Sequence, residues 1–521
     1  MHKFACLVML ATLASAASIG SRPAAAAPPQ DHPPASAHSA PLIPAAPPDA
    51  VTHHNLVLDG KTLHYTARVG QITLYDDERH PTARMSYVAY TLDGANPSDR
   101  PVTFFYNGGP GSSTVWLHMG SFAPVRLLAP DAHVPPPPPY RMTMNNPYSL
   151  LDVTDEVFVD APSTGFGRLI GAGKPKDFFG VDQDARAFAQ FIQTYITTFG
   201  RWNSPKFLLG ESYGTTRSAV VAAVLQEQGI QLNGIVLLSS ILNFALDWGT
   251  NFSPTDIGGG DWAYVLYLPS EAATAWYHHA LPDRPAHLRP FLEQVQHFAL
   301  TEYLQALADG STLSPSVRAD VVRKLHEYTG LSERYIENSN LRWPYWRFEN
   351  ELLRNQGKIV GRLDTRYETG TLDREAESPP WDPADVAMTP IFTALFNEYV
   401  RQTLDYHPTV PYRIVNYGQE LRNWDFKHHG VEPTNVAPDL AETMVQNPHL
   451  RVFSANGYYD FATPYFATVY TLEHLNLSPS LQRNITFGFY ESGHMVYMNE
   501  AALRQFHDDL ERWYRSVLTQ R

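Results

Sequence analysis

The stretch KFLLGESYGTTRSAVVAAV, residues 206–224, joins two kinds of pattern at one serine. The apolar residues 206–210 favour a buried strand, and the run from Thr215 to Gly229 favours a helix that ends at the glycine. Between them, GESYG at 210–214 has the spacing G-x-S-x-G, in which glycines permit a sharp turn that exposes the serine hydroxyl. The pattern predicts a strand–turn–helix unit with Ser212 as a nucleophile. An ordinary strand-to-helix turn is the alternative.

On both sides of this stretch, strand-like and helix-like segments alternate. Residues 55–92 carry short alternating segments separated by glycines, which predicts hairpins. Residues 181–200 place apolar side chains three to four positions apart, which predicts an amphipathic helix. Strands separated by helices of this length predict an α/β fold with a mostly parallel central sheet flanked by helices. Further strand-like runs lie at 102–108, 156–162, 234–240, 451–456 and 485–490.

The segment 244–440 has a different character, with helical patterns, many aromatic residues and few strand candidates. Because it lies between two strand-bearing regions, we expect it to form a helical cap inserted into the core. The core then has two parts, 51–243 and 441–521. Aromatic runs such as RWPYWRF at 342–348 are more typical of packing within the cap than of a substrate pocket.

The N-terminus has the pattern of an export signal. A positive charge near Met1 precedes an apolar run and small residues, which predicts a signal peptide over 1–27 and a secreted or periplasmic protein. A disordered N-terminus with chance hydrophobicity is the alternative. Residues 28–50, rich in proline and alanine, predict a disordered linker. The only cysteine is Cys6, so the mature protein is expected to lack disulfides and a cysteine nucleophile.

Composition and spacing argue against several classes of protein. Of the 521 residues 44% are hydrophobic, which suffices for a large core, and the net charge of −14 argues against a nucleic-acid surface. No later stretch is apolar enough for a membrane span. No dinucleotide fingerprint develops, so no cofactor is expected. Histidine pairs at 53–54, 278–279 and 428–429 lack H-E-x-x-H spacing and an evident carboxylate partner, so no metal site is predicted. The sequence does not indicate an oligomeric state.

A serine nucleophile needs a base, and the base needs an orienting carboxylate. In α/β-hydrolases these follow the serine in the order acid, then histidine, on loops after late strands. Asp460 comes after the strand-like run 451–456, and His494 comes between 485–490 and a terminal amphipathic pattern. The order Ser212, Asp460, His494 therefore fits a catalytic triad. Other acids near strands remain alternatives for the orienting role: Asp152, Asp160 and Glu491.

Five motifs in order resemble the serine carboxypeptidases (peptidase family S10), an α/β-hydrolase group. The resemblance runs from about residue 60 to the end and is weakest in the expected cap. The matching segments are NGGPGSS (107–113), NNPYSLLDVTDEVFVDAPSTGFG (145–167), GESYG (210–214), NGYYDFATP (456–464) and SGHMV (492–496).

The resemblance implies a role for each member of the catalytic group. Ser212 would attack the scissile carbonyl, His494 would relay the proton, and Asp460 would hold the imidazole in the required tautomer. The backbone N–H groups of Gly109 and Tyr213 would form the oxyanion hole.

The resemblance also implies a site for the free C-terminal carboxylate of a peptide. Asn107 and Glu211 would bind it by hydrogen bonds, and a Glu can do so only if one of the two carboxyl groups is protonated, which favours acidic pH. The family usually has a second Glu fourteen residues after the Asn, where this chain has Ser121. The Cys common after GGPG is Ser112 here.

The sequence therefore predicts a secreted α/β-hydrolase that acts as a serine carboxypeptidase-like peptidase through an acyl-enzyme on Ser212. Its partner would be a peptide or a small acyl substrate. The alternatives are a serine esterase or acyltransferase on the same fold, and a non-catalytic binding protein that kept the fold.

Overall fold

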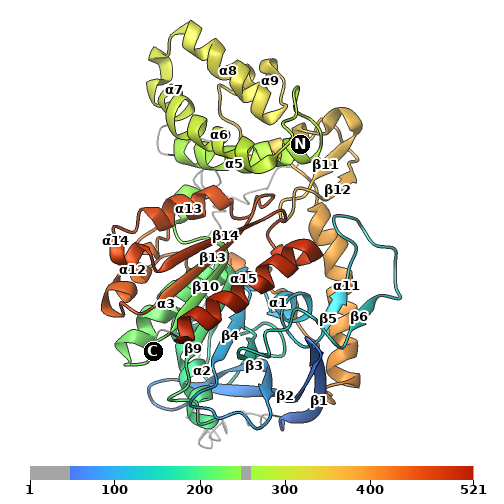
Figure 1. The fold of residues 1–521 in the computed structure, drawn as a ribbon, viewed down its shortest axis with the longest axis vertical. Helices are drawn as coiled ribbons and strands as arrows, with labels where there is room; N and C mark the ends of the chain where they lie inside the picture. Colours follow the sequence, from blue (N-terminus) through green and yellow to red (C-terminus); the bar gives the residue numbers. More distant parts are fainter. Residues whose placement is uncertain (1–46, 248–259, 520–521) are drawn as a thin grey trace, which may run out of the picture. The chain divides into compact units, whose positions relative to one another are not determined.

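The computed structural model describes residues 47–247 and 260–519. Its central sheet has the strand order β1-β2-β3-β7-β4-β9-β10-β13-β14, with β8 paired to β3. Figure 1 labels these strands except β7 and β8. The strands are β1 (Ala50–Leu58), β2 (Lys61–Tyr75), β3 (Pro81–Leu92), β4 (Val102–Tyr106), β7 (Asp155–Val159), β8 (Arg168–Leu169), β9 (Lys206–Ser212), β10 (Gly234–Ser240), β13 (Arg451–Gly457) and β14 (Ile485–Tyr490). Two small sheets pair β5 (Arg126–Leu128) with β6 (Arg141–Thr143), and β11 (Lys358–Val360) with β12 (Glu368–Gly370).

The direction of the strands confirms the predicted fold class. β1, β2 and β3 pair antiparallel, as the hairpin prediction requires, and β3 is antiparallel to β7. From β7 across to β14 every neighbouring pair is parallel. The predicted strands at 234–240 and 485–490 match β10 and β14, while β9 continues through Ser212 instead of ending at residue 210.

Helices cover both faces of the sheet, because successive strand residues point to opposite sides. Phe104 and Leu208 belong to the core cluster that includes α2, α3 and α12, whereas Phe105 and Leu209 belong to the cluster that includes α1, α11 and α15. This explains why the parallel strands are apolar at nearly every position. These helices are α1 (Val115–Gly120), α2 (Val181–Thr198), α3 (Tyr213–Glu227), α11 (Pro383–Gln402), α12 (Ala437–Gln446) and α15 (Glu500–Thr519).

Residues of the segment predicted as a cap, 244–440, belong to three different hydrophobic clusters. Helices α5 to α10 pack with the residues that follow β13, such as Tyr459 and Phe461, in a cluster of their own, and α5 to α9 lie at the top of Figure 1. In contrast, α11 and α12 pack against the two faces of the sheet. The remaining helices are α4 (Phe244–Asp247), α5 (Asp261–Tyr277), α6 (Leu288–Phe298), α7 (Leu304–Asp309), α8 (Pro315–Thr329), α9 (Glu333–Asn338), α10 (Tyr345–Glu351), α13 (Tyr465–Glu473) and α14 (Pro479–Gln482).

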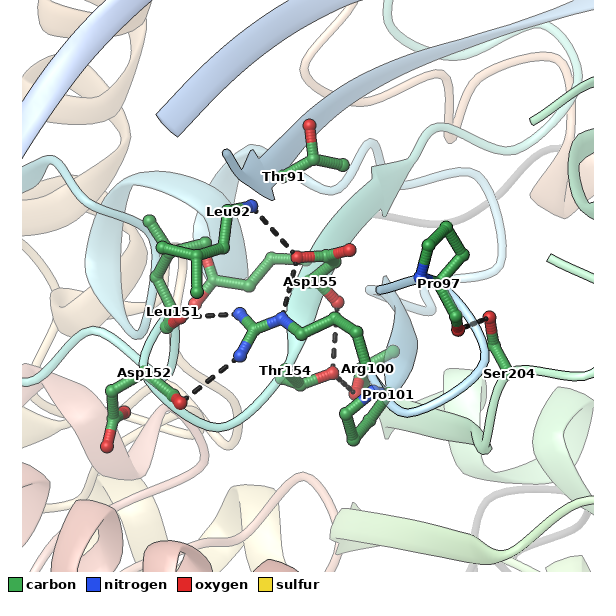
Figure 2. Close-up of polar contacts among 12 residues, drawn as sticks. Thr91, Leu92, Pro97, Arg100, Pro101, Leu151, Asp152, Thr154, Asp155 and Ser204 are labelled. Atoms are coloured by element: carbon green, nitrogen blue, oxygen red, sulfur yellow. Dashed lines mark hydrogen bonds and ion pairs between the residues drawn. The ribbon is translucent and has the colours of Figure 1, made fainter. Parts of the chain in front are cut away.

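A buried network of ion pairs and hydrogen bonds lies at the end of the sheet where β4, β7 and β9 begin. Arg100 donates from Nε to the Asp155 carboxylate at 2.9 Å and from Nη2 to the Leu151 carbonyl at 2.5 Å (Figure 2). Arg201 donates to the other oxygen of Asp155 at 2.6 Å. Because these strands are parallel, the network fixes their amino ends, and Ser212 lies at the opposite end of β9.

The N-terminal predictions fall mostly on residues that are not described. The predicted signal peptide, 1–27, and all but the end of the predicted linker, 28–50, lie outside the described residues, and β1 begins at Ala50. None of the helices in the described ranges combines the length and the apolar content that a membrane crossing requires.

Candidate active site

The turn between β9 and α3 carries Ser212 in a strained backbone conformation. β9 ends at Ser212, α3 begins at Tyr213, and the serine has φ 62° and ψ −131°. Gly210 has to be a glycine, because a Cβ there would overlap the backbone carbonyl of Gly214. The predicted strand–turn–helix unit is confirmed. A positive φ at a serine is a strained arrangement, which is more typical of functional sites than of ordinary turns.

His494 and Asp460 form a fixed hydrogen-bonded pair. His494 Nδ1 lies 2.8 Å from Asp460 Oδ2, and Asp460 is fully buried. The other carboxylate oxygen accepts the N–H groups of Ala462 (2.7 Å) and Thr463 (2.9 Å). Burial opposes a charge on His494, but the charge and hydrogen bond of Asp460 outweigh it and raise the pKa of the imidazole above its usual value. The other ring nitrogen, Nε2, is left for a reacting group.

One pocket of about 340 Å³ brings the predicted site residues together. Asp460 contacts His494 from behind and does not line the pocket. The pocket walls include the following predicted residues: Asn107, Gly109, Glu211, Ser212, Tyr213 and His494.

The glycine-rich loop contacts the start of α3 at this pocket. A Cβ on Gly108 would lie 2.5 Å from the amide nitrogens of Tyr213 and Gly214, so only glycine permits the approach. Gly109 follows with φ 105°. The two residues expected to supply oxyanion donors, Gly109 and Tyr213, therefore belong to segments in backbone contact beside Ser212.

Glu211 is a buried carboxyl group in the pocket wall. It is 2% exposed, and the Tyr497 hydroxyl donates to its Oε2 at 2.8 Å. Burial raises the pKa of Glu211 to about 7, against the opposing effects of the His494 charge and the hydrogen bonds from Tyr497 and Asn107. Glu211 is therefore largely protonated in mildly acidic solution and can donate a hydrogen bond to a carboxylate.

Comparison with known proteins gives a family for this arrangement. A family model described as serine carboxypeptidase matches residues 71–496, a range that contains every predicted site residue. The chain belongs to the serine carboxypeptidase family. A carboxypeptidase Y homolog from Arthroderma benhamiae (strain ATCC MYA-4681 / CBS 112371) is 32% identical over 134 residues, which cover 26% of this chain and 24% of that protein. The aligned part thus spans about a quarter of the length of this relative.

A solved carboxypeptidase shares the fold. The crystal structure of Kex1(delta)p, a prohormone-processing carboxypeptidase from Saccharomyces cerevisiae, matches with a TM-score of 0.52 at 15% sequence identity. The match covers 86% of this chain and 91% of that one. At this identity the likeness supports the α/β-hydrolase fold and nothing finer.

Ser121 lies where the serine carboxypeptidase pattern usually has a second Glu, and it does not line the pocket. It is fully buried at the end of α1, where its hydroxyl donates to the Leu117 carbonyl at 2.6 Å. In this chain the Tyr497 hydroxyl contacts Glu211 instead. Sequence reasoning did not find Tyr497, because nothing except its place three residues after His494 distinguishes it among 28 tyrosines.

A buried ion pair lies beside the pocket, between α2 and α3. Arg217 on α3 donates to Asp184 on α2 at 2.6 Å, and both side chains are almost fully buried. A second guanidinium nitrogen donates to the backbone carbonyl of Asn107 at 2.7 Å. Arg217 therefore ties the glycine-rich loop to the helix that follows Ser212. The sequence did not reveal this link, which joins positions 110 residues apart.

The three alternative acids do not contact His494 among the residues that the structure describes. Asp160 accepts hydrogen bonds from the Thr114 amide and from the Tyr412 hydroxyl, each at 2.9 Å. Asp152 pairs with Arg515 on α15. Glu491 is exposed on the loop that precedes His494.

The histidine pair at 428–429 does have carboxylate partners, contrary to the sequence expectation. His428 contacts Asp182 through Nδ1 (2.7 Å) and Asp439 through Nε2 (2.9 Å). Atoms of Asp182, His428 and His429 lie within 4.8 Å of one another, so these residues could hold a metal ion. A metal on His428 would have to displace one aspartate hydrogen bond. Burial lowers the pKa of His428, but the two aspartates outweigh it and raise the pKa.

Proposed function

We propose that this protein is an exported serine carboxypeptidase that releases C-terminal amino acids from peptides through an acyl-enzyme on Ser212. The observation that carries the proposal is a pocket lined by Ser212, by His494 with its partner Asp460 behind it, and by a buried Glu211 whose pKa is about 7. A nucleophile with its base indicates acyl transfer, and a protonated carboxyl group beside an amide suits a free carboxylate. Export is proposed from the N-terminal sequence alone.

The proposed reaction proceeds in two steps. His494 Nε2 takes the proton of the Ser212 hydroxyl as Oγ attacks the scissile carbonyl, and then passes it to the departing amine of the last amino acid. The N–H groups of Gly109 and Tyr213 stabilise the oxyanion, each contributing about 3–4 kcal/mol in the transition state. Water then attacks the ester with His494 as base, which releases the shortened peptide and restores Ser212.

Asn107 and protonated Glu211 would bind the terminal carboxylate and so limit cleavage to the last peptide bond. Tyr497 would keep Glu211 oriented through its hydrogen bond of 2.8 Å. The carboxylate of the substrate and an ionised Glu211 would repel each other, which makes the protonation of Glu211 a condition for binding.

The test is mass spectrometry of a peptide library after incubation with the protein. We expect stepwise loss of residues from the C-terminus, loss of this activity in Ser212→Ala, and resistance of the same peptides when they are C-terminally amidated. Cleavage inside peptides, or equal cleavage of amidated peptides, would contradict the proposal.

A serine esterase or acyltransferase is the second candidate, and the serine at position 121 in place of the family's usual Glu is the observation that favours it. Turnover of an N-blocked amino-acid ester, together with no release of an amino acid from the matching blocked dipeptide, would decide for this alternative.

A further inference from the structure

Arg362 lies between the two loops that carry the proposed base and its orienting acid. Its backbone carbonyl accepts the N–H of Phe461, next to Asp460, at 3.1 Å, and the carbonyl of Leu363 accepts the N–H of His494 at 2.6 Å. Its side chain lines the same pocket as Ser212. The charge of the guanidinium is close enough to His494 to act against the protonation of the imidazole.

The guanidinium of Arg362 has no anionic partner among the described residues. Its Nε is shut off from solvent without a hydrogen bond, and Cζ lies 5.9 Å from the ring centroid of Tyr345. Four other buried arginines each form an ion pair with an aspartate: Arg100, Arg201, Arg217 and Arg366. A partly buried charge without a partner is unfavourable, so an anion that enters the pocket gains a strong interaction there.

The charges of two nearby acids, Glu349 and Asp382, favour the charged form of Arg362, but neither carboxylate forms an ion pair with the guanidinium. Asp382 accepts the N–H groups of Leu363 (2.9 Å) and Ala384 (2.8 Å), and it forms no ion pair with the guanidinium. Burial raises the pKa of Glu349 well above its usual range, and Glu349 forms no ion pair with the guanidinium. Asp385 also lines the pocket, where it accepts the hydroxyl of Thr389 at 2.7 Å.

We propose that Arg362 binds a carboxylate of the substrate in this pocket. The inference rests on the proposed peptidase function, which it deepens. A guanidinium can bind a carboxylate through two parallel hydrogen bonds. The carboxylate comes either from an acidic side chain beside the scissile bond or from the C-terminus of the peptide, which would then be shared with Asn107 and Glu211.

The first test measures kcat/KM for N-blocked dipeptides that carry Glu or Gln at either position. If a side-chain carboxylate is the ligand, the protein prefers Glu to Gln by about tenfold or more at one position, the ratio that one charged hydrogen bond typically provides. Arg362→Met, which keeps much of the aliphatic stem against Tyr345, brings this ratio close to one. The exposed Arg323→Met on α8 is the matched control and keeps the wild-type ratio.

The second test measures binding without catalysis. Dissociation constants are determined for Ser212→Ala, with and without Arg362→Met, using the same dipeptides as free acids and as C-terminal amides. Loss of the Glu-over-Gln preference assigns the side chain as the source, and loss of the acid-over-amide preference assigns the C-terminus. Arg362→Met that binds all these ligands as its parent does overturns the inference.

The two tests separate this inference from the proposed function. A wild-type protein that releases no amino acid from any peptide refutes the peptidase proposal. If Ser212→Ala nevertheless binds acidic ligands in an Arg362-dependent way, the carboxylate site stands without it.

Discussion

Replacing Glu211 by glutamine tests whether a protonated carboxyl group holds the C-terminal carboxylate of the substrate. Glutamine keeps the shape and an N–H donor but never ionises. In the wild type the donor is present only while Glu211 is protonated, and burial raises its pKa to about 7. The two proteins should therefore differ on the alkaline side of the pH profile and agree on the acidic side.

The size of the difference follows from this pKa. With a pKa of about 7, Glu211 is about 90% protonated at pH 6 and about 1% protonated at pH 9. For substrates with a free C-terminus, the ratio of kcat/KM in the wild type to kcat/KM in Glu211→Gln should fall about a hundredfold over this interval, mainly through KM. The ratio isolates Glu211, because the glutamine donor does not titrate and the titration of His494 affects both proteins alike. The fall in activity on the acidic side, where His494 becomes protonated and cannot act as a base, should remain in both proteins.

The assay is steady-state hydrolysis of a blocked dipeptide between pH 5 and 9, with an ester that lacks a free carboxylate as the comparison substrate. Tyr497→Phe is the matched control. It removes a hydrogen bond that favours the ionised form of Glu211, so the alkaline limb should move to higher pH. An alkaline fall in Glu211→Gln as steep as in the wild type would refute the reasoning, as would an equal fall with the ester.

Three further changes test other parts of the structure. Asp460→Asn should lower kcat by about 10⁴-fold with little change in melting temperature, because His494 loses its orienting carboxylate; a drop below about tenfold would contradict the proposed role. Arg217→Met should lower the free energy of unfolding by about 3–5 kcal/mol in urea titrations, because it leaves Asp184 buried and unpaired, and replacing both residues by apolar ones should recover most of the loss. His428→Gln should lower the melting temperature near about pH 5.5 and have little effect near about pH 9. The aspartates raise the folded-state pKa of His428, so the stability that charged His428 contributes is present below the usual histidine pKa and is lost as pH rises through the raised value. An equal effect at both pH values would argue against a stabilising charge on His428.

The local elements were predictable because their signals are local. The apolar runs at 234–240 and 485–490 match β10 and β14, and the helix expected at 181–200 is α2. The turn at Ser212 follows from five consecutive residues. Local pattern did not predict which surface each helix between residues 244 and 440 packs against. Some of these helices pack on the sheet, and others form a separate cluster.

The features of the candidate site likewise fall into those that local sequence predicts and those that depend on the tertiary structure. The sequence by itself determined the strand–turn–helix unit at Ser212 and the order of Asp460 and His494, because periodicities of two and 3.6 residues and turn chemistry act over a few neighbouring positions. Only the tertiary structure decided which acid contacts His494, that Tyr497 lies beside Glu211, and that Arg362 lines the pocket with no ion-pair partner among the residues that the structure describes. These features join residues from 34 to 286 positions apart, and the folded backbone sets their contacts and burial, which no local pattern encodes.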